Sequence, residues 1–149
     1  MKAVIQRVSE ASVVVSHNTV GSIESGLLIF LGIGHDDHSD DIEWLVRKIS
    51  QLRIFSDDAG KMSKSLIDVN GSALVISQFT LFASTKKGNR PSFINAAPPE
   101  LAKTLYEKFL YKMKECGVTV ASGIFGADMK VSLLNDGPVT IIIDTKNKE

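Results

Sequence analysis

The segment GLLIFLGIG, residues 26–34, is apolar at nearly every position. A strand with one face in water alternates apolar and polar side chains, so an unbroken apolar run indicates a strand that is covered on both faces. The run is shorter than a typical helix and far shorter than the ~20 residues that cross a bilayer. We therefore expect a central buried strand, and we expect helices to cover it.

Two later segments have the apolar spacing of helices that could provide this cover. In residues 40–53 the apolar side chains recur at helical intervals, and Asp40 with Glu43 has the form of a capping box. In residues 99–115 an apolar stripe begins at Leu101 and continues at every fourth position. Each segment predicts one amphipathic helix.

The other patterned segments have the composition of strands. AVIQRVSEASVVVS predicts two strands with a turn near Ser9–Glu10, and SHNTVGSI predicts a turn into a short strand. Further strands are expected in four segments: SALVISQFTLFA, VTVASG, KVSLLN and VTIIID. The prediction is one α/β domain over residues 1–149, compact and mainly antiparallel, with a β-barrel-like sheet and two helices packed outside.

Composition narrows the classes of function. Lys and Arg together number 17, as do Asp and Glu, so the formal net charge is zero, which argues against a protein that holds nucleic acid mainly by bulk electrostatics. The single cysteine, Cys116, excludes an intramolecular disulfide and favours a reducing compartment. The first residues lack the apolar stretch of a signal peptide. We expect a cytoplasmic protein with no membrane segment.

The histidines offer little for catalysis. His17, His35 and His38 all fall in predicted turns or loops, and no serine sits in a G-x-S-x-G motif, so a Ser-His-Asp triad is not expected. HDDH, residues 35–38, has the composition of a metal site, but we interpret it as a surface loop that caps the first helix, and we expect no metal or cofactor. The aspartates expected in this solvated cap are Asp36, Asp37, Asp40 and Asp41.

The segment SQFTL, residues 77–81, is the strongest polar signal in an apolar strand. Ser77, Gln78 and Thr80 must each find a partner, or their burial costs about 1–3 kcal/mol. They could simply satisfy neighbouring loops. Alternatively, the end of the strand lines a polar pocket, with hydroxyl and backbone N–H groups directed at a ligand carbonyl.

Two other segments allow both a structural and a functional interpretation. KKGNRPSF places Lys86, Lys87 and Arg90 in one loop, which is either a solvated charge run or a phosphate-binding loop. NDGPVT places Gly137 before Pro138, which is either a tight turn or a rigid backbone element held against a ligand.

These motifs together resemble the D-aminoacyl-tRNA deacylases, formerly called D-tyrosyl-tRNA deacylases. The resemblance extends over the whole chain, and SQFTL and NDGPVT are its most specific motifs. The stretches that carry it are MKAVIQRVSEASV, GLLIFLGI, LRIFSDDAGKMSKSL, SQFTLFAS, KKGNRPSF and LLNDGPVT, and two of them contain these motifs.

The resemblance implies an enzyme that hydrolyses the ester joining a D-amino acid to tRNA, which keeps D-residues out of translation. It also implies a homodimer with active sites at the interface. The peptide between Gly137 and Pro138 would be cis and would reach into the partner's site, where it rejects L-residues. Whether glycine mischarged on tRNA(Ala) is a further substrate stays open.

The resemblance assigns catalytic positions to the SQFTL motif. The backbone of Phe79 and Thr80 would stabilise the oxyanion, while Ser77 and Gln78 shape the pocket. The Thr80 hydroxyl would position water or substrate rather than act as nucleophile, because no base is evident beside it, and the RNA 2′-hydroxyl would aid the reaction.

Three further residues are expected at the substrate. Arg7 would anchor the Gly-Pro element through carbonyl contacts, although an ordinary surface arginine would look the same in sequence. Phe125 and Met129, on either side of Gly126 in SGIFGADMKV, would flank the pocket for the terminal adenosine, although core packing explains both equally well. The rival functions are an RNA-binding module without catalysis and a deacylase of relaxed chirality.

Overall fold

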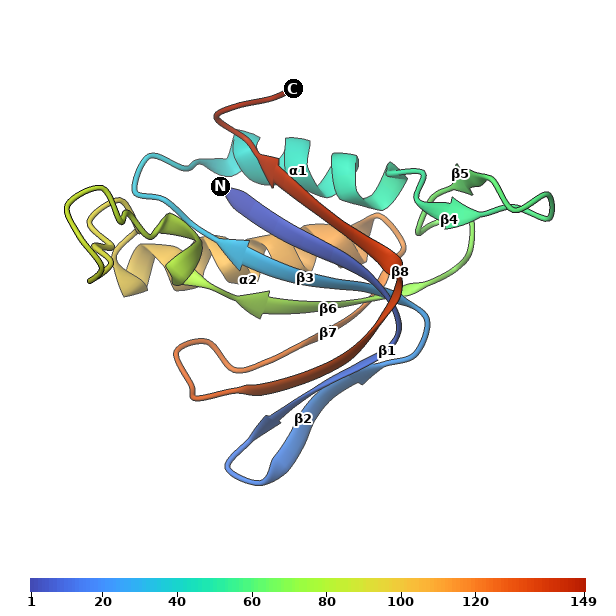
Figure 1. Ribbon diagram of the computed structural model, residues 1–149, viewed down its shortest axis with the longest axis horizontal. Helices are drawn as coiled ribbons and strands as arrows, with labels where there is room; N and C mark the ends of the chain where they lie inside the picture. Colours follow the sequence, from blue (N-terminus) through green and yellow to red (C-terminus); the bar gives the residue numbers. More distant parts are fainter.

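The computed structural model describes all residues from 1 to 149, and it consists of a strongly curved sheet, a separate two-stranded sheet, two long helices and one short 3-10 helix (Figure 1). The elements in chain order are β1 (Lys2–Val15), β2 (Asn18–Ile23), β3 (Gly26–Gly32), α1 (Ser39–Gln51), β4 (Phe55–Ser56), β5 (Met62–Lys64), β6 (Ser72–Ser77), η1 (Phe79–Phe82), α2 (Pro99–Glu115), β7 (Thr119–Ser122) and β8 (Lys130–Asp144).

The main sheet has six strands and is nearly closed. Its path is β2-β1-β3-β6-β7, and β8 pairs with the other edge of β1. The three pairs that include β1 are antiparallel, whereas β3 with β6 and β6 with β7 are parallel. The ends of the path meet, because a Cβ on Gly21 of β2 would lie 2.6 Å from the carbonyl oxygen of Ser122 in β7. The predicted α/β class with a mainly antiparallel, barrel-like sheet is confirmed.

Strand β3 is buried on both faces, as its unbroken apolar run predicts. Leu27, Ile29 and Leu31 pack with both long helices in the larger hydrophobic core. Leu28 faces the opposite way and packs with Leu74 in a second core inside the curved sheet. Helices therefore cover only one face of β3, and the expectation of helices on both faces was wrong because the sheet curls over its own inner face.

Helix α2 has the predicted bounds, from Pro99 to Glu115. Its predicted stripe is wrong at one position, because Leu101 is exposed while Leu105 and Phe109 are buried. The neighbouring Ala102 faces the core in place of Leu101, since the buried face drifts around a helix with 3.6 residues per turn. Neither long helix has the length and apolarity that a membrane span requires.

Helix α1 begins at Ser39 and ends at Gln51, close to the expected 40–53. Its capping box differs from the predicted one. The backbone N–H of His38 donates to the Asp41 carboxylate at 2.9 Å, so the box starts two residues before Asp40 and does not use Glu43.

The two longest strands were each predicted as two separate strands. No turn occurs at Ser9–Glu10, because β1 runs on from Lys2 to Val15 and only its register with β8 shifts there. Likewise KVSLLN and VTIIID belong to the single strand β8, which resumes pairing with β1 after the Gly-Pro peptide. Figure 1 shows β1 and β8 side by side along the whole bend of the sheet.

Candidate active site

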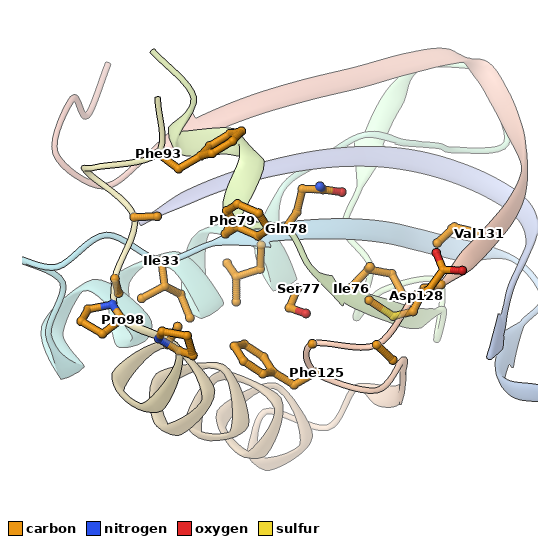
Figure 2. Close-up of a pocket in the computed structure, with 18 residues that line it drawn as sticks. Ile33, Ile76, Ser77, Gln78, Phe79, Phe93, Pro98, Phe125, Asp128 and Val131 are labelled. Atoms are coloured by element: carbon orange, nitrogen blue, oxygen red, sulfur yellow. The ribbon is translucent and has the colours of Figure 1, made fainter. Parts of the chain in front are cut away.

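A pocket of about 670 Å³ lies where the parallel strands β3 and β6 end. Its walls come from the end of β3, the turn from β6 into η1, the segment before α2 and the loop before β8. Figure 2 shows Ser77, Phe79 and Phe125 around this space, with Pro98 across from them at the start of α2. Most of the lining is apolar, which suits a site that buries a ligand and directs a few polar groups at it.

The structure brings together only some of the predicted site residues. Those that line the pocket are Ser77, Gln78, Phe79, Phe125 and Met129. Those that do not line it are Arg7, Thr80, Lys86, Lys87, Arg90, Gly137 and Pro138. Their chemical roles stay predictions, whichever group they fall in.

The SQFTL motif does not continue the buried strand. Strand β6 ends at Ser77, Gln78 is half-buried, and the chain then turns into η1, which leaves Phe79 and Thr80 exposed. The prediction that one buried strand carries all three polar side chains was therefore wrong for Gln78, which lies after the end of β6, and for Thr80, which is exposed in η1. The alternative drawn from the same motif describes the structure, because Ser77 and Gln78 lie at the end of the strand on the pocket.

The change from strand to 3-10 helix leaves two backbone donors free. The N–H of Gln78 donates to the Leu31 carbonyl at 2.8 Å, and the N–H of Leu81 donates to the Gln78 carbonyl at 3.3 Å. Between them, the N–H groups of Phe79 and Thr80 donate to no acceptor. Free N–H groups at the first turn of a helix can stabilise a developing negative charge.

The Thr80 hydroxyl is held by its neighbour rather than activated by a base. The Gln78 side-chain amide donates to Thr80 Oγ1. No histidine lines the pocket, and Asp128 is the only titratable residue that does.

Aromatic side chains support two walls of the pocket. Phe79 meets Phe93 edge to face, with the ring centroids 5.0 Å apart. On the opposite wall Phe125 packs against Tyr106 at 5.8 Å, and the buried Tyr106 hydroxyl donates to the Val75 carbonyl at 2.8 Å. Burial raises the pKa of Tyr106 to about 12, so this hydroxyl stays a neutral donor.

Among the lining residues that the sequence did not predict, one is aromatic, Phe93, and one is charged, Asp128. Phe93 is the last residue of the KKGNRPSF segment, and its position directly after a basic loop was the only sequence feature that could have indicated a place in the site. Asp128 is an exposed carboxylate at the rim of the pocket, next to Lys130 at 3.2 Å. Nothing in the sequence separates Asp128 from an ordinary surface aspartate.

The basic loop lies beside the pocket without lining it. Ser84 and Ser92 close its base through two backbone hydrogen bonds of 2.8 and 2.9 Å. Lys86, Lys87 and Arg90 are exposed, and none of them forms an ion pair within the chain. Phe93, directly after the loop, connects it to Phe79.

The Gly137–Pro138 peptide is cis, as the resemblance implies, and both residues are exposed. Arg7 contacts this turn: its Nε donates to the Asp136 carbonyl at 2.9 Å, and another guanidinium nitrogen donates to the Ile54 carbonyl at 2.7 Å. The turn lies outside the pocket of its own chain.

The aspartates around the HDDH segment do not form a solvated cap. Asp37 is only 2% exposed and pairs with the Met1 ammonium at 2.5 Å, while Asp41 pairs with Lys146 at 3.0 Å. Burial by itself would raise the pKa of Asp41, but hydrogen bonds from Thr145, the His38 backbone and Lys146 outweigh it and lower the pKa to about 2. Only Asp36 and Asp40 are exposed as expected. The chain contains no group of three or more potential metal-binding His, Cys, Asp or Glu residues.

Comparison with known proteins relates this chain to one family. The family described as D-Tyr-tRNA(Tyr) deacylase matches residues 4–144. A D-aminoacyl-tRNA deacylase of Christiangramia forsetii is 62% identical, with 99% of each chain covered. A D-aminoacyl-tRNA deacylase of Cytophaga hutchinsonii is 60% identical over the full length of both chains.

Two solved structures share the fold. One, named as a c-Myc DNA Unwinding Element Binding Protein, superposes with a TM-score of 0.92 at 43% identity and covers 97% of this chain and 98% of its own. The other, described as a probable eukaryotic D-amino acid tRNA deacylase, has a TM-score of 0.81 at 16% identity, with 95% and 97% covered. From the family match and the full-length relatives, the chain belongs to the D-Tyr-tRNA(Tyr) deacylase family, a family of hydrolases.

Proposed function

We propose that this chain hydrolyses the ester bond between a D-amino acid and tRNA, which frees the tRNA and keeps D-residues out of translation. The observation that carries the proposal is the pair of free N–H groups of Phe79 and Thr80 in η1, beside an apolar pocket that Phe79 lines and Thr80 does not, in a chain of this family. All 149 residues would act as one deacylase domain.

The reaction needs little more than positioning and charge stabilisation. Water adds to the ester carbonyl carbon, and the resulting oxyanion accepts hydrogen bonds from the Phe79 and Thr80 N–H groups. The bond to the ribose oxygen then breaks, and that oxygen takes up the proton lost by the water, with the neighbouring 2′-hydroxyl relaying it. One such backbone donor contributes ~2.7–4 kcal/mol to an oxyanion transition state, which suits an already activated ester.

The side chains of the pocket would orient the end of the tRNA. Phe125 and Met129 provide an apolar surface on which the terminal adenine can stack, as bases do in single-stranded RNA recognition. Ser77 and Gln78 supply the polar end nearest the ester. Lys86, Lys87 and Arg90 would hold phosphates of the acceptor end, because they are exposed and have no acidic partner in the chain.

Chirality would be enforced by rejection. The exposed Gly137–Pro138 turn would enter the pocket of a partner chain, where it blocks the direction taken by an L-side chain and leaves the direction of a D-side chain open. A filter that works by collision with a side chain has nothing to collide with in glycine. Glycine mischarged on tRNA(Ala) is therefore a second expected substrate.

This filter requires a homodimer with its active sites at the interface. The outer edge of β8 pairs with no strand of its own chain. Along β8, Leu134 and Ile142 are 58% and 75% exposed. An unpaired strand edge with exposed apolar side chains is an aggregation risk unless another surface covers it, and a second copy related by a two-fold axis would cover it.

The free Cys116 suits a cytoplasmic location.

The rival function is nucleic-acid binding without catalysis, which the name of one similar structure brings forward. A turnover assay separates the two, in which D-Tyr-tRNA(Tyr) is incubated with the protein and the surviving ester is measured over time. A deacylase shortens the ester half-life in proportion to its concentration. A binding protein leaves the half-life at the value without protein, and that result would refute the proposed function.

A further inference from the structure

The pairing of β1 with β8 contains an unusually large irregularity at the Gly-Pro turn. Gln6 pairs with Thr140, and Val8 pairs with Asn135. One residue of β1, Arg7, therefore lies opposite four residues of β8, whereas an ordinary bulge opposes one residue with two. The segment 136–139 is a four-residue loop that stands out from a strand.

Asn135 closes the base of this loop. Its side-chain Nδ2 donates to the Arg7 carbonyl at 3.0 Å and to the Val139 carbonyl at 3.0 Å. A carboxamide has two N–H donors, so both are used, and because both partners are carbonyls the nitrogen must face them. One side chain thus connects the entrance of the loop, its exit and the neighbouring strand.

The other contacts fix the sides of the loop but not its tip. Arg7 Nε donates to the Asp136 carbonyl at 2.9 Å, and Gln6 Nε2 donates to Thr140 Oγ1 at 3.1 Å just beyond the exit. Gly137 and Pro138 are exposed and receive no such side-chain hydrogen bond. The position of the tip therefore depends on how tightly the base is held.

We propose that Asn135 is a positioning residue for chirality selection, and that its double hydrogen bond holds the Gly-Pro tip at the height needed to exclude an L-side chain. This inference rests on the proposed function. Asn135 does not line the pocket, and its side chain forms no hydrogen bond with Gly137 or Pro138, so it would act through the backbone that it ties together.

The role predicts a specific response to substitution. Asn135→Asp keeps the shape of the side chain but replaces both donors with acceptors, which then face two carbonyl oxygens. The base of the loop opens, and the tip becomes mobile. The D-over-L ratio of kcat/KM should fall at least tenfold, mainly because hydrolysis of the L-ester rises, while the KM for tRNA changes little because the phosphate contacts lie elsewhere.

The experiment compares wild type with Asn135→Asp and with Asn135→Ala. The alanine variant removes both donors without adding charge, and it replaces Asn135→Asp as the test variant if Asn135→Asp fails to fold. Asn18→Asp is the matched control, since Asn18 Nδ2 donates to the Ser16 carbonyl at 3.1 Å in an exposed turn remote from the loop. Hydrolysis of D-Tyr-tRNA(Tyr) and L-Tyr-tRNA(Tyr) gives the ratio. The NMR order parameter of the Gly137 amide, expected to fall from about 0.85 to below about 0.6, reports the loop without any activity.

The outcomes separate the two proposals. A wild type that hydrolyses neither ester refutes the proposed function, and the order parameter then decides whether Asn135 holds the loop. The role of Asn135 is refuted if the wild type selects the D-ester but the Asn135 variant matches Asn18→Asp in both its D-over-L ratio and its Gly137 order parameter. A lower ratio together with a lower order parameter supports it.

Discussion

Replacing Gly137 by alanine should disrupt chirality selection by an amount that can be worked from the structure. A Cβ at this position would lie 2.4 Å from the Val139 backbone nitrogen and 2.8 Å from Val139 Cγ2. Ordinary contacts begin at 3.4 Å, so the nitrogen contact must lengthen by 3.4 minus 2.4, or 1.0 Å. The Gly137 φ of +156° is also one that L-residues rarely adopt.

A displacement of this size at a site that depends on exact positioning can lower the catalysed rate by a factor on the order of 10². We therefore expect Gly137→Ala to lower the D-over-L ratio of kcat/KM by about that factor, measured by hydrolysis of D-Tyr-tRNA(Tyr) and L-Tyr-tRNA(Tyr). Gly117→Ala is the control, because it also requires a positive φ, of +91°, but its Cβ would meet no atom within 4 Å. A Gly137→Ala protein that stays folded and keeps the wild-type ratio would show that this loop is only a turn.

Three further outcomes are expected. Thr80→Ala should keep kcat within about tenfold of wild type, because the backbone N–H that holds the oxyanion remains. If a folded Thr80→Ala protein instead shows a single-turnover rate at the uncatalysed level, the Thr80 hydroxyl is the nucleophile. Replacing Lys86, Lys87 and Arg90 by glutamine should raise KM more than it lowers kcat. It should also reduce the slope of log KM against log salt by about 2, since each phosphate contact with a single strand contributes ~0.7 to that slope. A loss of kcat with KM unchanged would contradict this prediction. Asp41, with its pKa lowered from 3.8 to about 2, should stabilise the fold by about 1–2 kcal/mol above pH 4 and lose this contribution as the pH falls from 3.8 to 2. Urea unfolding of wild type and Asp41→Asn at several pH values checks it, and a stability difference that does not shrink on acidification would refute it.

The helices and the central strand could be predicted because their signals are local. The bounds of α2 follow from periodicity and from Pro99 and Gly117 at its ends, and the burial of β3 follows from its unbroken apolar run. The strand irregularities could not be predicted in this way. Two exposed polar residues such as Ser9–Glu10 suit a turn and a bulge equally well, and only the partner strand β8 decides between them.

The candidate site was predicted in part, for a similar reason. The polar residues of SQFTL mark the end of β6, but their sequence does not show that the chain turns there and frees two N–H groups. Asp37 and Asp41 were misjudged because their partners, Met1 and Lys146, lie at the two ends of the chain. Asn135 was marked only as the first residue of the NDGPVT motif, and its hydrogen bonds could not be predicted because they depend on which carbonyl groups the register of β1 and β8 brings to it.

The most direct test of the account is the hydrolysis of D-Tyr-tRNA(Tyr) and L-Tyr-tRNA(Tyr) under identical conditions, with the tRNA and the ester linkage unchanged and only the chirality reversed. The account predicts that the protein shortens the half-life of the D-ester and leaves that of the L-ester at its value without protein. Equal cleavage of both esters would contradict selection by the Gly137–Pro138 turn. No cleavage of either would contradict the proposed enzyme activity itself.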